Sequence, residues 1–161
     1  MNIVTVYPTN YQEKCELMEF VYKNTDSFIM NTFGFLWESR DLWSYGVDVA
    51  KDDKGNIIGL HAAHIKDINN EPHVKTYYIV TDKNRQGEGI AKKLILHLLL
   101  DATIANYSKY YVNSEINSPG VKFFKKFIGI EPEIVNNDFG TTDCVFKTTI
   151  AEILKRHEQT I

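Results

Sequence analysis

The chain has 161 residues, 43% of them hydrophobic, and a formal net charge of -3 at pH 7. This size predicts a single domain over residues 1–161 with a substantial core, and the mild acidity argues against a protein held to nucleic acid by bulk positive charge. The longest apolar run, Leu94–Leu100, is too short to span a bilayer, and residues 1–14 lack the pattern of a signal peptide, so we expect a cytoplasmic protein without a membrane partner. Cys15 and Cys144 form no ligand motif, and no metal site is expected.

Strands and helices follow one another along the predicted chain. Asn2–Tyr7 is predicted as a strand, and Thr9 or Asn10 caps a helix that extends to about Lys23. The segment Asn24–Tyr45 is less regular and rich in aromatic residues. Further strands are predicted at Tyr45–Lys51, Ile57–Lys66, Val74–Thr81, Lys109–Ser114 and Thr142–Thr149, and further helices at Ile90–Ala105 and Ala151–Gln159. This order predicts an α+β fold with a mixed, mostly antiparallel central sheet and helices on both faces.

A glycine-rich loop joins the strand Val74–Thr81 to the helix that begins at Ile90. Gly87 and Gly89 let a phosphate approach the backbone closely, and the unpaired N–H groups and dipole of an opening helix favour an anion. The loop has no G-x-x-x-x-G-K-[ST] of a P-loop, and Lys92 stands where the dinucleotide pattern G-x-G-x-x-G needs its third glycine. The loop predicts a pyrophosphate site of another kind, with a tight turn that packs the helix on the sheet as the alternative.

Two motifs carry a family resemblance. Gln86–Ala91 resembles the coenzyme A loop of the GNAT superfamily of N-acetyltransferases, whose pattern is [QR]-x-x-G-x-[GA]. Asn117–Gly129 is similar to the second motif of that family, N-x-x-A-x-x-F-Y-x-K-x-G-F, in the same order along the chain. The resemblance covers about Tyr45–Phe146 and implies a GNAT-like acyl-CoA N-acyltransferase fold. It departs at Phe124, where many members have a tyrosine that protonates the leaving thiolate.

The resemblance implies an acyl-CoA-dependent N-acyltransferase whose co-substrate is acetyl-CoA or another acyl-CoA. A primary amine would take the acetyl group by direct attack in a ternary complex, and a backbone N–H near Thr81 would hold the oxyanion. Arg85 and Lys92 are the cations nearest the coenzyme phosphates in sequence. The residues that the resemblance assigns to coenzyme binding are Ile79, Val80, Thr81, Gln86, Gly87, Gly89, Ile90, Ala91, Lys92 and Asn117.

The general base is not identified by the resemblance, because Lys75 stands near a position where some relatives have a catalytic glutamate. The candidates are His61, His64, His73, Tyr77 and Glu115. A histidine titrates near the working pH and burial can raise the pKa of a carboxyl group, so His64 and Glu115 could take the proton directly or through water, as could Tyr77. The structural alternatives are a hydrogen bond within a half-buried strand for His64, core packing for Tyr77, and a solvated strand end for Glu115.

The acceptor is an amine of unknown identity, and two alternative functions stay open. In one, the protein is a catalytically weak sensor or interaction module that binds acyl-CoA, as the phenylalanine at position 124 and the missing carboxylate suggest. In the other, the acceptor is a macromolecule, such as a protein lysine, a transfer RNA or a modified nucleobase, although the acidic balance disfavours nucleic acid. Trp37 and Trp43 are interpreted as core residues, with the wall of an acceptor pocket as the alternative.

The C-terminal segment has an apolar stripe at helical spacing. Ile150, Ile153, Leu154 and His157 share one helix face, and such a stripe must be buried on its own domain or on a partner. The sequence alone leaves both choices open, and we favour a homodimer.

Overall fold

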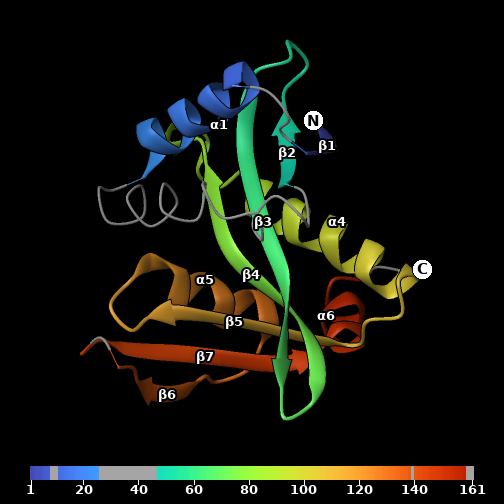
Figure 1. Cartoon of the computed structure of the whole chain (residues 1–161), viewed down its shortest axis with the longest axis vertical. Coiled ribbons are helices and arrows are strands. Elements are labelled where there is room, and N and C mark those ends of the chain that lie inside the picture. Colours follow the sequence, from blue (N-terminus) through green and yellow to red (C-terminus); the bar gives the residue numbers. More distant parts are fainter. Residues whose placement is uncertain (8–10, 26–46, 139, 159–161) are drawn as a thin grey trace. The chain divides into compact units, whose positions relative to one another are not determined.

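The computed structural model describes residues 1–7, 11–25, 47–138 and 140–158, whose strands form a mixed sheet (Figure 1). The strand order is β1-β2-β3-β4-β5-β7-β6, with β4 and β5 parallel and β1–β2, β2–β3, β5–β7 and β6–β7 antiparallel. The predicted mixed, mostly antiparallel sheet is therefore confirmed. The elements are β1 (Asn2–Val6), α1 (Tyr11–Asn24), β2 (Val47–Lys51), β3 (Ile57–Ile68), β4 (Glu71–Thr81), the 3₁₀ helix η1 (Lys83–Arg85), α4 (Ile90–Ile104), β5 (Lys109–Glu115), α5 (Pro119–Ile128), β6 (Glu133–Asn136), β7 (Thr142–Thr149) and α6 (Ile150–Arg156).

The chain divides into two compact units. The first unit consists of Met1–His64 and Tyr77–Leu98, and the second unit consists of Ile65–Thr76 and Leu99–Ile161. The strands β3 and β4 and the helix α4 each contribute residues to both units. The single domain predicted over residues 1–161 stays a prediction.

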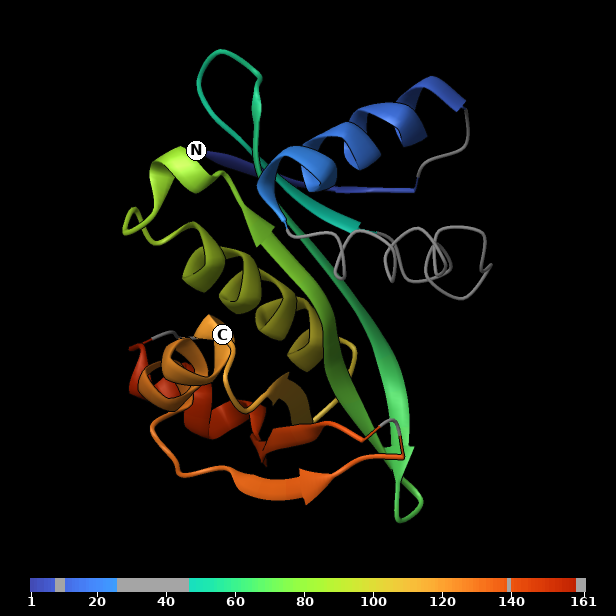
Figure 2. The ribbon, with the colours of Figure 1, turned by 90° about the vertical axis from the view of Figure 1, so that its left-hand side faces the viewer.

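Two apolar clusters build the core of the first unit, one on each face of its strands. Val49 and Ala50 are consecutive residues of β2, so their side chains point to opposite faces of the sheet. Val49 packs in a cluster with α1, and Ala50 packs in a cluster with α4, so the two helices cover opposite faces (Figure 2). The first cluster contains Leu17, Phe20, Val21, Val47, Val49, Leu60, Ala62 and Val80, and the second contains Ala50, Ile58, Ile90 and Leu94.

A glycine in β3 lets α4 approach the sheet closely. A Cβ at Gly59 would lie 2.6 Å from Cγ2 of Ile90 and 2.9 Å from Cδ1 of Leu94. Both side chains are buried, so neither has free space into which it could move. The contact between α4 and β3 therefore depends on the absence of a side chain at Gly59.

The second unit has one apolar and one polar sheet face. Val112 of β5 lies opposite Phe146 of β7 in the strand register, and the ring of Phe124 in α5 lies 6.0 Å from the ring of Phe146. The helices α5 and α6 lie on one side of β5 and β7 (Figure 2). Tyr111, the next residue along β5, is paired with Lys147 and points to the opposite face.

The C-terminal helix α6 is shorter than predicted and buries its own apolar stripe. Thr149 caps it by accepting a hydrogen bond from the backbone N–H of Glu152 at 3.2 Å. Ile150, Ile153 and Leu154 are all buried within the chain. The stripe therefore supplies no argument for a second copy, and the homodimer stays a prediction without this support.

Three features of the sheet differ from the sequence prediction. β4 begins at Glu71, three residues before the predicted Val74. Asn69 and Asn70, which precede it, have φ values of 53° and 64°, and a two-residue hairpin turn of type I′ needs positive φ at both positions. β6 and η1 were not predicted: β6 has only four residues, all of them exposed, and its two apolar residues, Ile134 and Val135, do not alternate with polar ones. No described helix is long and apolar enough to cross a membrane.

Candidate active site

The loop after β4 has a backbone that glycine accepts more easily than other residues. Asp82 caps η1 by accepting a hydrogen bond from the backbone N–H of Asn84 at 2.9 Å. Beyond η1, φ is 86° at Gly87 and 77° at Gly89. A Cβ at either glycine would have no described atom of another segment within 4 Å. The two glycines are thus required by backbone conformation, and open space lies beside them.

This open space distinguishes Gly87 and Gly89 from a glycine that serves packing. At Gly59 an added Cβ would overlap side chains of α4, whereas at the two loop glycines it would meet none among the described residues. Close packing of the helix on the sheet therefore explains Gly59 but not the loop. Gly55 and Gly140 likewise have positive φ and open space, so these two features leave the loop free for a ligand without identifying one.

The loop leads directly into the first turn of α4. The backbone N–H of Lys93 donates to the carbonyl of Gly89 at 3.0 Å, which is the first hydrogen bond of the helix. Ile90 is buried and anchors this turn, while Lys92 is exposed. The N–H groups of a first helical turn have no partner within the helix, and together with the helix dipole they attract an anion.

The guanidinium of Arg85 forms ion pairs with carboxylates of the protein, so its charge is less available to a ligand. Its guanidinium lies 3.1 Å from a carboxylate oxygen of Asp52, 3.6 Å from Glu88 and 4.0 Å from Asp82. Asp52 belongs to the turn between β2 and β3, so this ion pair ties two loops together. Lys92 is then the more available of the two cations that the sequence suggested for the coenzyme phosphates.

At the end of β4, the side chains of Ile79 and Val80 pack in the core, so only their main-chain groups are available to a ligand. The side chain of Val80 is buried in the cluster with α1, and Ile79 packs against the cluster with α4. The amide of Gln86 donates to the hydroxyl of Thr81 at 3.5 Å, which joins the strand end to the loop. Any contact of residues 79 and 80 with a coenzyme would therefore be made by main-chain groups.

Two of the five candidates for the general base, His64 and Tyr77, lie side by side in the first unit. The rings of His64 and Tyr77 stack with their centroids 3.6 Å apart and their planes 27° apart. Both side chains are half-buried, on the neighbouring strands β3 and β4. The stack holds an imidazole and a phenol against each other, and both are groups that can take part in general acid–base chemistry.

The other histidines of β3 and β4 are poorly suited to proton transfer. His61 is 2% exposed, and burial lowers its pKa to about 4, so its imidazole is neutral at physiological pH. His73 is buried as well, with its Nδ1 2.9 Å from the carbonyl oxygen of Glu71. Both imidazoles therefore belong to the interior of their strands.

The remaining candidates belong to the second unit. Glu115 is exposed at the end of β5, where it lies opposite Asp143 in the strand register. Asn117 is exposed in the turn before α5. Phe124 is buried, and its ring packs against Phe146, so it contributes to the core of this unit.

Comparison with known proteins gives the family. The sequence model of the Acetyltransferase (GNAT) family matches residues 10–130. This match covers most of the chain. The protein belongs to the GNAT family of acetyltransferases. The resemblance drawn from the two motifs is thereby confirmed, and the protein is a GNAT N-acetyltransferase. A search of curated proteins found no match.

Solved structures share the GNAT fold at low sequence identity. A GNAT-family protein from Desulfovibrio desulfuricans has a TM-score of 0.74 at 11% identity, over 92% of this chain and 99% of that chain. Aminoglycoside 6′-acetyltransferase type Ii has a TM-score of 0.72 at 15% identity, over 93% and 97%. YhbS from Escherichia coli, solved in complex with CoA, has a TM-score of 0.66 at 16% identity, over 94% and 82%. At these identities the likeness shows the fold alone, and it confirms the predicted fold class.

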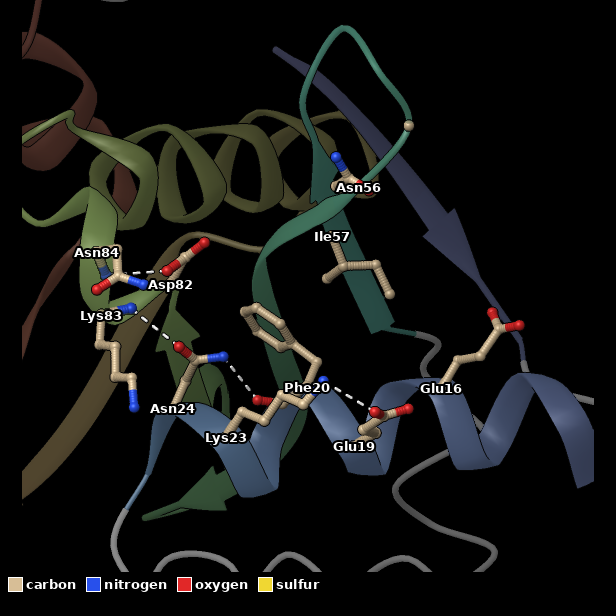
Figure 3. Close-up of a pocket in the computed structure, with 11 residues that line it drawn as sticks. Glu16, Glu19, Phe20, Lys23, Asn24, Asn56, Ile57, Asp82, Lys83 and Asn84 are labelled. Atoms are coloured by element: carbon tan, nitrogen blue, oxygen red, sulfur yellow. Dashed lines mark hydrogen bonds and ion pairs between the residues drawn. The ribbon is translucent and has the colours of Figure 1, made fainter.

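A pocket of about 540 Å³ in the first unit is lined by residues of α1, of the turn between β2 and β3, and of the segment at η1 (Figure 3). α1 and η1 are linked at this pocket, because the side chain of Asn24 donates to the carbonyl of Phe20 at 2.8 Å and accepts from the backbone N–H of Lys83 at 2.9 Å. Its lining residues are Glu16, Glu19, Phe20, Lys23, Asn24, Gly55, Asn56, Ile57, Asp82, Lys83 and Asn84. Neither the loop glycines nor the stacked pair His64 and Tyr77 line it, so it is separate from both.

The remaining sequence predictions concern the acceptor pocket and a metal site. Trp37 and Trp43 lie outside the described residues, and so does any acceptor wall that they would form. In the described part of the chain, no three His, Cys, Asp or Glu side chains gather to hold a metal ion. The sequence also missed the environment of Lys75, which only the neighbouring strands define.

Proposed function

We propose that this GNAT protein transfers the acetyl group of acetyl-CoA to a primary amine. The observation that supports it most directly is the loop before α4, where Gly87 and Gly89 have positive φ and open space beside them. A pyrophosphate fits such a loop because it can approach the backbone N–H groups without meeting a side chain. The CoA complex of YhbS, which has the same fold, supports coenzyme A as the ligand.

The proposed coenzyme contacts follow the end of β4 and the start of α4. Main-chain groups of residues 79 to 81 would hold the pantetheine arm, and the N–H groups of the loop and of the first helical turn would hold the pyrophosphate. The proposed residues are Ile79, Val80, Thr81, Gln86, Gly87, Gly89, Ile90, Ala91, Lys92 and Asn117. The family match extends over both units, which supports the proposal that residues 1–161 form one domain.

The proposed chemistry is direct transfer in a ternary complex. A neutral amine attacks the thioester carbonyl, negative charge develops on the oxygen, and coenzyme A leaves as a thiolate. A backbone N–H near Thr81 would stabilise the oxyanion, a contribution of roughly 10²- to 10³-fold in rate for one such donor. We propose the pair His64 and Tyr77 as the group that takes the proton from the amine, with Glu115 as the second candidate.

Phe124 bears on how the leaving thiolate is protonated and on whether the protein is an active enzyme. A buried phenyl ring cannot protonate the thiolate, so in our proposal the thiolate leaves unaided or is protonated by water. The same residue favours the alternative of a catalytically weak module that binds acyl-CoA. The acceptor is proposed as a small amine by analogy with the aminoglycoside acetyltransferase of the same fold, and a macromolecular amine is the alternative.

Thermal unfolding with coenzyme tests the binding step. Coenzyme A or acetyl-CoA at a hundredfold excess over its dissociation constant should stabilise the fold by about 2.7 kcal/mol, a rise of several degrees in Tm. NAD and ATP should raise the Tm much less. Gly89→Val should lose most of the coenzyme-induced rise, because a branched side chain fills the open space and strains a backbone with positive φ.

A glycine of the second unit provides a matched control. Gly140 has a φ of 78° and also has no described atom near an added Cβ, so Gly140→Val carries a similar backbone strain in the turn before β7. It should lower the Tm but keep the full coenzyme-induced rise. The binding proposal fails if both variants keep the rise, or if wild type shows none at saturating coenzyme. Release of free thiol from acetyl-CoA in the presence of a panel of amines then separates an enzyme from a binding module.

A further inference from the structure

Two lysines and a tyrosine form a cluster on three adjacent strands of the second unit. Nζ of Lys66 in β3 lies 4.9 Å from the centre of the Tyr111 ring in β5, and Nζ of Lys75 in β4 lies 5.3 Å from the same ring. Lys75 and Tyr111 are also the last of the three residue pairs that join β4 to β5. The side-chain nitrogens of Lys66 and Lys75 both lie near the Tyr111 ring, so the two ammonium groups repel each other when both are charged.

The cluster lies on the polar face of this unit. Tyr111 points away from the face on which α5 packs against Phe146. Asp143 of β7 attracts the charge of Lys75, and its carboxylate also accepts hydrogen bonds from Asn113 at 3.1 Å and from Asn137 at 3.2 Å. Its charge is therefore shared among neutral donors, and it offsets only part of the repulsion between the two lysines.

These surroundings disfavour the charged form of Lys75. Burial, and next the ammonium of Lys66, lower the pKa of Lys75 from 10.5 to about 8, while Asp143 acts in the opposite direction. Burial, together with Asp143 and Glu133, raises the pKa of Tyr111, so its phenol stays neutral. At pH 7.5 an amine with a pKa of 8 is roughly one quarter neutral, whereas an ordinary lysine is neutral to roughly 0.1%. Lys75 thus presents a nucleophile where other lysines present an ammonium.

We propose that Lys75 is an acyl acceptor within the protein itself, so that its side chain becomes an Nε-acyl lysine in the presence of acyl-CoA. The inference rests on the proposed function, which supplies acyl-CoA as the donor. The neutral Nζ attacks the thioester carbonyl carbon, a C–N bond forms, the C–S bond breaks, and coenzyme A leaves as a thiolate. The new amide nitrogen loses one proton, which the thiolate or solvent takes up, so atoms and charges balance.

The product suits its surroundings better than the ammonium does. An amide carries no charge, so it removes the repulsion with Lys66 and the cost of holding a half-buried cation. It keeps the long side chain beside the Tyr111 ring but loses the attraction between the ammonium and that ring, which opposes the gain. The modification is therefore favoured by the same features that make the amine neutral.

Mass spectrometry of the intact folded chain tests the proposal. Wild type is incubated with acetyl-CoA at pH 7.5, and the acetylated position is located by peptide mapping at successive times. Lys147, an exposed lysine on the same face with Glu133 at 3.9 Å, is the internal reference. The larger neutral fraction of Lys75 speeds its reaction, and the weaker nucleophilicity of a less basic amine slows it. Taking both effects together, we expect Lys75 to react about tenfold faster than Lys147. In the urea-unfolded chain the two lysines should react at equal rates.

Substitutions of Lys66 and Asp143 should change the acetylation rate of Lys75 in opposite directions. Solvent exposure of Lys75 alone would not produce opposite changes. Lys66→Met removes a like charge, raises the pKa of Lys75 and should slow its acetylation. Asp143→Asn removes an attractive charge, lowers that pKa and should speed it. A change of half a pKa unit corresponds to about a threefold change in neutral fraction. Rates that move in the same direction in both variants overturn the proposal.

The outcome for Lys75 can be separated from the outcome for the proposed function. If coenzyme raises the Tm of wild type but Lys75 reacts no faster than Lys147, the inference is wrong and the acyltransferase proposal stands. If coenzyme causes no rise and no lysine reacts preferentially, both fail. Lys75→Arg, which keeps the charge but offers no neutral amine at this pH, must abolish the modification at this position while leaving the coenzyme-induced rise in place.

Discussion

Replacement of Lys75 by methionine should make the protein more stable at neutral pH. A pKa lowered from 10.5 to about 8 means that folding disfavours the ammonium. The shift corresponds to at most roughly 3 kcal/mol, and because the side chain is half-buried, solvent screening reduces this to about 1 kcal/mol. Methionine keeps the apolar stem beside Tyr111 and has no charge to desolvate, so Lys75→Met should gain about 1 kcal/mol at pH 7.

The gain should depend on pH in a defined direction. The pKa is lower in the folded state, so the penalty on wild type is complete below pH 8, fades as the pH rises from 8 towards 10.5, and is absent above. Urea unfolding of wild type and variant at pH 6.5, 8 and 9.5 measures it, and near neutral pH the variant should also have a Tm about 2 to 4 °C higher. Lys147→Met, at an exposed position of the same face, is the matched control and should change stability little. A Lys75→Met variant less stable than wild type at pH 6.5, or a difference that does not shrink with pH, would refute the reasoning.

Two further substitutions test the packing that positions the loop and the C-terminal helix. Gly59→Ala places a Cβ 2.6 Å from Ile90 and 2.9 Å from Leu94, and should cost about 1 to 3 kcal/mol in urea unfolding; an unchanged midpoint would show that α4 can move away from β3 freely. Thr149→Ala removes the side-chain cap of α6 and should cost about 1 kcal/mol, whereas Thr149→Ser keeps the hydroxyl and should restore most of it; equal losses in the two variants would mean that the cap contributes nothing.

The apolar pattern was sufficient to predict most of the fold. Thr142–Thr149 has a central apolar run, Cys144–Phe146, between β-branched and polar residues, and β7 has the same bounds. The pattern failed at Glu133–Asn136, a four-residue edge strand paired with β7, whose two apolar residues, Ile134 and Val135, are adjacent and both exposed. Periodicity reports burial, so it does not identify an element that buries nothing.

Sequence was also a poor guide to which polar residues meet. Asp48 follows a valine in an alternating strand and looks like an outward residue, but it is buried, with the hydroxyl of Thr5 donating to it at 2.6 Å and Nδ1 of His97 at 3.4 Å. Likewise, His64 and Tyr77 stack because the β3–β4 hairpin brings them together. The glycines of the loop are a local signal and were predictable, whereas these contacts depend on the register in which the strands pair.

The polar cluster around Lys75 shows why stability and chemistry must be measured separately. A half-buried amine beside a second lysine lowers stability, and methionine at this position would remove that cost without leaving a cavity. If Lys75→Met is more stable than wild type and cannot be acetylated, the cluster is retained for reactivity rather than for folding, as local destabilisation at a functional site implies. If Lys75→Met is less stable at every pH, Lys66, Lys75 and Tyr111 form a packing arrangement, and the lowered pKa is a by-product of that packing.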